Sequence, residues 1–160
     1  MKFVSPLIVV ADLERARSFY NEVLGLNVIL DFGENITLTG GVSLQTRGSW
    51  MTFIQKKSHE IQFGGNDAEL YFEEDEFDRF IEKLNNIEGI DYVHPALEHR
   101  WGQRVVRFYD PDGHIIEVGE TMSEVCRRFL KSGLSVSQTA ERMGVSTEYV
   151  RLCISEEEAE

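Results

Sequence analysis

Apolar positions along the chain follow strand and helix patterns in turn. Residues 3–10 form an apolar run rich in β-branched side chains, which predicts a buried strand. Asp12 then stands at the N-cap position of a helix whose apolar residues recur at helical spacing until Gly25. Further strands are predicted over residues 26–32, 36–38 and 42–47. Residues 49–57 fit either a short helix capped by Ser49 or another strand.

The same order of elements then occurs a second time. Residues 69–73 predict a strand, Asp75 opens a second amphipathic helix, and Gly89 ends it. One constant offset superimposes the apolar positions of the two helices and pairs Leu13 with Phe77. Strands are then predicted over residues 91–98, 103–109 and 114–119. An internal repeat of this kind determines the architecture.

The repeat predicts an α+β fold of two βαβββ modules. Each helix covers the outer face of its sheet, and the inner faces form a curved mixed sheet with a cup-shaped cavity. The last two strands are joined by Asp110-Pro111-Asp112-Gly113, a strong turn signal. We expect the paired modules to occupy residues 1–120 and a helical extension to occupy residues 121–160.

The C-terminal extension contains a pattern that resembles a helix-turn-helix over residues 134–150. Ala140, Gly144 and Val150 are small or apolar where that motif needs them. The charge argues against DNA binding, because Glu148 lies on the second helix and residues 155–160 are acidic. We expect a helical appendage, and a DNA-binding regulator is the remote alternative.

Composition narrows the class of partner. The chain has 16 basic and 28 acidic residues and a net charge of −12, which argues against nucleic-acid and anionic-membrane partners. Cys126 and Cys153 match neither a disulfide framework nor zinc spacing, which favours a reducing compartment. No apolar run reaches the roughly 18 residues of a membrane span, and no signal peptide is evident. We therefore expect a cytoplasmic protein.

Two stretches carry a resemblance to a known family. Residues 8–20 read IVVADLERARSFY, residues 23–26 read VLGL, and residues 101–117 read WGQRVVRFYDPDGHIIE. Over residues 3–120 the chain resembles the glyoxalase/bleomycin-resistance/extradiol-dioxygenase superfamily, also called the vicinal oxygen chelate fold. The resemblance implies this fold, a small-molecule ligand and a homodimer. It leaves the reaction open, since the superfamily includes isomerases, dioxygenases and non-catalytic drug-binding proteins.

The resemblance also implies a divalent metal site in the cup. Its ligand positions fall on Ser5, Gln45, Glu69 and Glu117, with Ser5 where the family usually has His. Gln45, Glu69 and Glu117 would form an oxygen-only set suited to Mg or Mn, with Ni or Zn as alternatives. None of these positions is His, which disfavours a dioxygenase. A degenerate site would hold no metal.

Strand alternation independently places Glu69 and Glu117 on the cup face. Two carboxylates in one cavity repel each other, so a cation, an arginine or a shared proton must relieve them. Arg104 and Arg107 are the arginines near Glu117 in sequence, and the hairpin register decides between them. With a metal, Glu69 or Glu117 would be the catalytic base.

The predicted ligand pocket combines polar and aromatic side chains. Its members are Ser5, Trp50, Tyr71, His99, Trp101, Arg104 and Arg107. The first functional hypothesis is metal-assisted lyase or isomerase chemistry on a small oxygenated metabolite. The alternative is a non-catalytic protein that binds a drug, an antibiotic or another small molecule.

Overall fold

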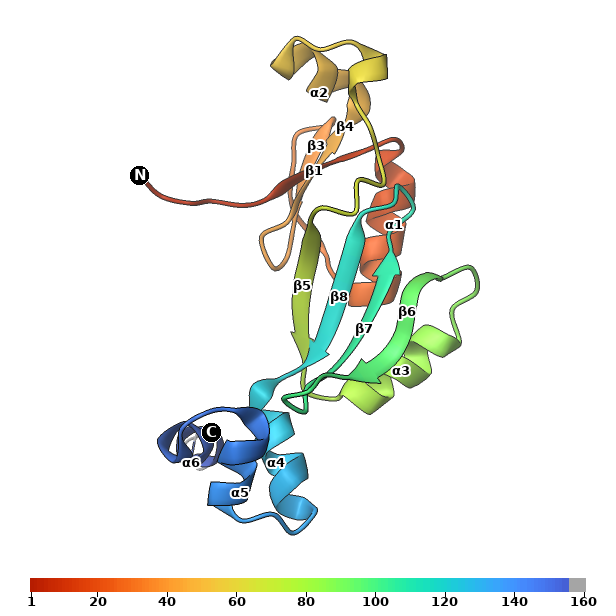
Figure 1. Ribbon diagram of the computed structural model, residues 1–160. Helices are drawn as coiled ribbons and strands as arrows, with labels where there is room; N and C mark the ends of the chain where they lie inside the picture. The colour runs from red at the N-terminus through yellow and green to blue at the C-terminus, as the bar shows by residue number, and fades with distance from the viewer. Residues whose placement is uncertain (156–160) are drawn as a thin grey trace. The chain divides into compact units, whose positions relative to one another are not determined.

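The first sheet carries the first βαβββ module in the computed structural model, which describes residues 1–155. Its elements are β1 (Leu7–Val10), α1 (Leu13–Leu24), β2 (Val28–Asp31), β3 (Asn35–Leu38) and β4 (Ser43–Thr46). The strand order is β1-β4-β3-β2, with β1 parallel to β4 and the other neighbours antiparallel (Figure 1).

Helix α1 has the limits that the sequence predicts. The side chain of Asp12 accepts a hydrogen bond from the backbone N–H of Arg15 at its N-terminus. Gly25 ends the helix in the left-handed region, with φ of 70°. Ala16, Tyr20 and Val23 are the buried residues of α1.

The ambiguous segment after β4 is a helix, α2 (Arg47–Ile54). Its cap is Thr46, whose hydroxyl accepts a hydrogen bond from the backbone N–H of Ser49. The expected cap at Ser49 was therefore wrong, because the helix begins two residues before Ser49. A short 3-10 helix, η1 (Ser58–Glu60), follows.

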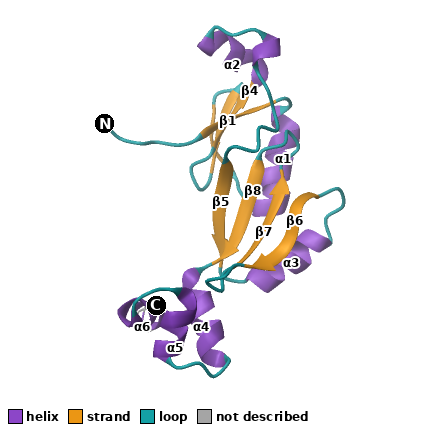
Figure 2. Cartoon of the chain, viewed as in Figure 1, coloured by secondary structure: helices purple, strands orange, loops and turns teal. Residues whose placement is uncertain are grey.

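The second sheet repeats the topology of the first. Its module consists of β5 (Glu69–Glu74), α3 (Phe77–Asn85), β6 (Asp91–Glu98), β7 (Arg104–Tyr109) and β8 (Ile115–Glu120). The strand order β5-β8-β7-β6 matches β1-β4-β3-β2 element for element. In Figures 1 and 2, β5 and β8 point the same way and β7 points the opposite way. The structure thus confirms the α+β class and the internal repeat.

The limits of α3 differ from the prediction. Glu76 is the N-cap residue and makes no capping hydrogen bond with its side chain. The carboxylate of Asp75, the expected cap, accepts a hydrogen bond from the Thr121 hydroxyl at 2.8 Å instead. The helix ends with Asn86 as its C-cap, and Gly89 lies beyond it in the connection to β6, with φ of 81°.

Three helices follow β8, namely α4 (Met122–Lys131), α5 (Val136–Met143) and α6 (Thr147–Ser155). They share a buried core of Val125, Cys126, Phe129, Ala140, Met143, Val150 and Cys153. Gly144 ends α5 in the left-handed region, as a helix-turn-helix requires. Arg142 on α5 is held by Glu98 and the backbone carbonyl of Arg100, so it is not free for a phosphate. The acidic tail at residues 156–160 lies outside the described residues.

The chain divides into two compact units. The first comprises Met1–Glu69 with Tyr109–Ile115, and the second comprises Leu70–Phe108 with Ile116–Glu160. The turn between β7 and β8 therefore belongs to the first unit. The domain limits expected from the sequence, at residues 1–120 and 121–160, stay a prediction. In residues 1–155, none of the helices is long and apolar enough to span a bilayer.

One buried carboxylate organises this turn. The Asp110 side chain is fully buried and accepts hydrogen bonds from the Tyr20 hydroxyl, His114 Nδ1 and the backbone N–H groups of Asp112 and His114, at 2.8 to 3.0 Å. Gly113 completes the turn with φ of 86°. A β-carbon at this residue would lie 3.2 Å from the backbone of Gly64.

The contact between Asp110 and His114 lowers the pKa of the carboxyl group and raises the pKa of the imidazole, each relative to its ordinary value. Burial alone would raise the pKa of Asp110, but the hydrogen bond and charge of His114 and the backbone donors lower it. Burial alone would lower the pKa of His114, but the hydrogen bond and charge of Asp110 raise it above its usual value. Asp110 is therefore stabilised as a carboxylate and His114 as an imidazolium.

Asp110→Asn should destabilise the fold by about 3 kcal/mol, because it removes a buried charge that four donors surround. In the unchanged protein, the contribution of Asp110 is present above the ordinary carboxyl pKa and is lost as pH falls through the lowered pKa. The contribution of His114 is present below the ordinary imidazole pKa and is lost as pH rises through the raised pKa. Urea unfolding as a function of pH measures both effects. Glu14→Gln, at an exposed ion pair with Arg17, is the control, and an equal loss there would contradict the assignment.

Candidate ligand-binding site

An ion pair between β7 and β8 lies on the sheet face opposite to α3. Because successive side chains of a strand point to opposite faces, Glu117 of β8 points away from the face that carries the buried residues Ile116 and Val118. Glu117 is only 5% exposed and forms an ion pair with Arg107. The Nη1 of Arg107 also lies 3.2 Å from Nε2 of His94 on β6. The hairpin register thus assigns Arg107, and not Arg104, to Glu117.

Arg104 belongs to a second carboxylate on the other face of the same strands. Glu120 is 2% exposed, and its carboxylate accepts hydrogen bonds from Arg104 and from Arg128 of α4, at 3.0 to 3.2 Å. Arg104 also donates to Asp78 of α3 at 2.7 Å. Burial would raise the pKa of Glu120, but the two guanidinium groups lower it.

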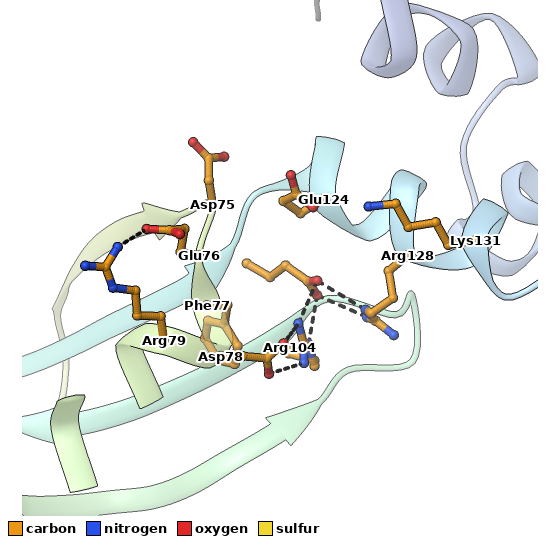
Figure 3. Close-up of a pocket in the computed structure, with 10 residues that line it drawn as sticks. Asp75, Glu76, Phe77, Asp78, Arg79, Arg104, Glu124, Arg128 and Lys131 are labelled. Carbon is orange, nitrogen blue, oxygen red and sulfur yellow. Dashed lines mark hydrogen bonds and ion pairs between the residues drawn. The ribbon is translucent and has the colours of Figure 1, made fainter. Parts of the chain in front are cut away.

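A charged pocket of about 420 Å³ surrounds this network (Figure 3). Arg104 and Arg128 line it together with further charged residues, among them Arg79, Glu124 and Lys131. The guanidinium of Arg104 is bonded to Asp78 of α3 and to Glu120 of β8, and Glu120 is also bonded to Arg128 of α4. The network therefore connects both helices to the end of the sheet. We therefore assign Arg104, a predicted ligand residue, to packing within the second unit.

A chain of hydrogen bonds runs along the edge of the sheet face that carries Glu117. The indole N–H of Trp101 donates to Oε1 of Gln103 at 3.2 Å. The amide of Gln103 donates to the Tyr71 hydroxyl at 2.8 Å and to the backbone carbonyl of Glu120 at 2.9 Å. Tyr71 in turn donates to Glu73 at 2.9 Å. This chain fixes the orientation of two exposed aromatic side chains, Trp101 and Tyr71.

Gln103 was missing from the residues that the sequence singled out. It is 7% exposed and lies directly after Gly102, whose φ of 94° turns the backbone between β6 and β7. Gly119 of β8 makes room for it, since a β-carbon there would lie 2.9 Å from the Gln103 amide and 3.2 Å from the Tyr71 hydroxyl. A polar residue immediately after a glycine in a strand-edge turn was the available signal.

His99 and Trp101 form a stacked aromatic pair beside this chain. Their ring centroids are 4.4 Å apart and the planes meet at 20°. Trp101 is 40% exposed and Tyr71 is 48% exposed, so ring surface is left for a further molecule. Burial chiefly lowers the pKa of His99, and the charges of Arg107 and His94 add to that, so its imidazole is neutral near pH 7.

The structure thus brings five of the predicted residues onto one part of the second unit. They are Tyr71, His99, Trp101, Arg107 and Glu117. We call this group, together with Gln103, the β5–β8 face. Its chemistry is an aromatic stacking surface, a fixed amide and hydroxyl, and a carboxylate whose charge is matched by an arginine.

The remaining predicted residues belong to the first unit. The hydroxyl of Ser5 lies 3.2 Å from that of Ser43. Gln45 is 2% exposed; its Oε1 accepts from the Asn35 amide at 2.8 Å and its Nε2 donates to Ser49.

Two more of them lie at cavities of this unit. Glu69 begins β5 as an exposed residue beside a small cavity with Asn66 and Ile115. Trp50 lines a separate pocket with His114.

Two of the three proposed metal ligands already have partners within their own sheets. Gln45 has both ends of its amide engaged, and the charge of Glu117 is compensated by Arg107. Within residues 1–155, no group of three or more His, Cys, Asp or Glu side chains is arranged to hold a metal ion. The metal site implied by the resemblance stays a prediction.

The fold and the β5–β8 face define a paired-module protein with an open polar and aromatic sheet surface. A family model described as a glyoxalase-like domain matches residues 3–123. The chain therefore belongs to the glyoxalase-like domain family. No curated protein matches the chain.

Solved structures are similar to the chain over its paired modules. A protein of unknown function from Agrobacterium tumefaciens str. C58 is 37% identical, with a TM-score of 0.68, over 76% of this chain and 95% of that one. A glyoxalase/bleomycin resistance protein/dioxygenase from Nocardioides is 20% identical, with a TM-score of 0.61, over 75% of this chain and 83% of that one. A glyoxalase/bleomycin resistance protein/dioxygenase family enzyme from Burkholderia phytofirmans PsJN is 16% identical, with a TM-score of 0.64, over 74% and 98% of the two chains. The similarity to the Nocardioides and Burkholderia structures shows that the chain shares their fold.

Glu120→Gln should destabilise the second unit by about 3 kcal/mol, because it leaves Arg104 and Arg128 without a buried counter-charge. Asp78→Asn is the matched control, since Asp78 pairs with the same arginine but its side chain is 79% exposed. The control should cost under about 1 kcal/mol. Urea unfolding of the two variants measures the difference, and equal losses would remove Glu120 from its central place in the network.

Proposed function

We propose that the protein binds a planar small molecule on the β5–β8 face without acting on it chemically. The observation that carries the proposal is the stacked His99–Trp101 pair, held in place by Gln103 and still partly exposed. Binding sites combine aromatic surface with a few fixed polar groups in this way. The family resemblance supports a small-molecule ligand, and the net charge of −12 favours a cationic one.

The polar groups of the face restrict the ligand further. The Tyr71 hydroxyl accepts from Gln103 and donates to Glu73, so its direction is fixed before a ligand arrives. A planar ligand that stacks on Trp101 can hydrogen-bond to this hydroxyl at its edge. The neutral imidazole of His99 adds ring surface without a charge that would repel a cation.

Catalysis is less well supported by the same residues. The expected general base, Glu117, must reach the substrate proton, but it is 5% exposed and paired with Arg107. The metal-assisted lyase or isomerase stays a prediction, and Gln45 and Glu117 among its expected ligands already have partners. The name of the Nocardioides protein includes both resistance proteins and dioxygenases, so it does not separate the two functions.

The expected homodimer and cytoplasmic location also stay predictions. The dimer is supported by the apolar side chains of β2 and the residue after it, because Ile29 is 56%, Leu30 52% and Phe32 73% exposed. β2 is an edge strand of the first sheet, and exposed apolar edge strands are common places for a second chain to pack.

Trp101 should report ligand binding by its fluorescence. In Trp50→Phe, Trp101 is the only tryptophan, and titration with metal-free bleomycin or the planar cation proflavine should quench its emission. Trp101→Phe should weaken binding about twofold to threefold, because the phenyl ring keeps only part of a stack that contributes about 1 kcal/mol. Trp50→Phe is the matched control and should retain full affinity in calorimetry. Equal affinities in the two variants would place the ligand elsewhere.

Added divalent metal should not stabilise the protein, because two of the proposed ligands, Gln45 and Glu117, are already engaged. With about 1 mM Mg²⁺ or Mn²⁺, we expect a change in melting temperature of less than about 1 °C. A rise of several degrees that Glu69→Gln and Glu117→Gln both abolish would support the metal-assisted enzyme and overturn the binding-only proposal.

A further inference from the structure

A second pocket lies in the first unit and contains an aspartate–histidine pair that the β5–β8 face does not use. It has a volume of about 380 Å³, and its apolar wall includes Trp50, Ile54, Ile61 and Phe63. His114 lines the same pocket. The pocket thus combines an apolar wall with one imidazole.

The imidazole of His114 is held in one orientation. Nδ1 lies 2.8 Å from Oδ2 of Asp110, whose side chain is fully buried. The carboxylate can only accept, so Nδ1 carries a proton, and Nε2 is the nitrogen available to a ligand. The ring of Phe63 meets that of His114 edge to face, with centroids 6.1 Å apart, and restricts its rotation. A histidine fixed by a buried carboxylate favours the doubly protonated form.

The other ionisable residue of the pocket wall is already satisfied. Glu60 accepts a hydrogen bond from Lys56 Nζ at Oε1 and from the backbone N–H of Lys57 at Oε2, at 3.0 and 2.9 Å. Arg47 lies 5.6 Å from the centroid of the Phe63 ring and places a positive charge beside that ring, although it does not line the pocket. Asp112, near the same turn, is paired with Arg15 at 2.7 Å. The imidazolium of His114 is therefore the charge that a ligand would meet.

We infer that this pocket binds an organic anion with an aromatic or other apolar body, whose carboxylate or similar group accepts a hydrogen bond from Nε2 of His114. The apolar wall of Trp50, Ile54, Ile61 and Phe63 contacts the body of the ligand. The Asp110 carboxylate favours the imidazolium form of His114, in which Nε2 also carries a proton, so the bond from Nε2 to the anion is charge-assisted. The pocket residues belong to the first unit, whereas the β5–β8 face belongs to the second. The inference therefore does not depend on the proposed function.

The inference predicts a definite pH dependence. Asp110, Asp112, Glu60 and Arg47 are the charged groups around His114, and Asp110 dominates because it is bonded to the ring. The pKa of His114 is raised, so anion binding should be strong at slightly acidic pH and should weaken as pH rises through that pKa. A bound anion should raise the pKa of His114 further, by linkage.

The probe is 2-naphthoate, and the neutral 2-naphthamide is its matched analogue. NMR of protein labelled at His Cε1 follows the imidazole signals of His59, His94, His99 and His114. At about pH 6, naphthoate should bind at least roughly tenfold more tightly than naphthamide, as expected for one charge-assisted hydrogen bond. It should shift the His114 signal and raise the titration midpoint of that signal. At about pH 9 the preference for the anion should fall below roughly twofold.

Three variants separate the site from its alternatives. His114→Gln should bind the two probes equally, and His59→Gln, at an exposed residue of η1, should behave as the unchanged protein. Since His114→Gln also disturbs Asp110, Ile54→Trp provides a variant that fills the pocket without touching the pair. It should abolish naphthoate binding while the His114 midpoint of the free protein stays unchanged. Equal binding of both probes at acidic pH, an unperturbed His114 signal, or full binding by Ile54→Trp would each overturn the inference. Trp101→Phe should leave naphthoate binding intact, which distinguishes this site from the β5–β8 face.

Discussion

The charge of Asp110 is the constraint on which the first unit depends. Its carboxylate is buried and receives four hydrogen bonds, from Tyr20 of α1, from His114 and from two backbone N–H groups of its own turn. A buried charge is tolerated only when such donors surround it. The pair thereby joins residues far apart in the sequence and fixes the turn before β8. The same hydrogen bond holds the imidazole of His114, which lines a pocket. The contact that stabilises the turn therefore also fixes a group that can bind a ligand.

Two further carboxylates, Glu117 and Glu120, are compensated by the same means. Arg107 pairs with the first, and Arg104 and Arg128 pair with the second. The sequence has more acidic than basic residues by 12, yet each of these buried acids has a basic partner. In the part of the chain that the structure describes, Asp110 is the only other buried acid, so the remaining acidic residues act on ligands through the field at the surface rather than as a free acid at the site.

Most of the fold was predictable because it follows local rules. Apolar periodicity located both helices and eight strands, and the repeated pattern predicted the topology that the two sheets share. The predicted helix caps at Ser49 and Asp75 were wrong. Thr46 caps α2 instead, and the carboxylate of Asp75 is bonded to the distant Thr121 hydroxyl. The site was harder to predict, since the choice between Arg104 and Arg107 depends on hairpin register. Gln103 was missed because its role depends on the space that Gly119 leaves, and its place directly after Gly102 was the one signal in the sequence.

In each module, a polar residue at an equivalent position of the last strand is bonded to a side chain of the neighbouring strand. Gln45 on β4 and Glu117 on β8 occupy the same place in sheets of identical strand order. Gln45 is bonded to Asn35, its register partner on β3, and Glu117 is paired with Arg107 on β7. One module therefore uses a neutral amide pair and the other a charged pair, and both satisfy the polar group from the neighbouring strand. A residue satisfied in this way has fewer lone pairs left for a metal or a substrate proton. The repeat thus keeps the same strand order in both sheets, while each sheet satisfies its equivalent polar residue with a different kind of partner.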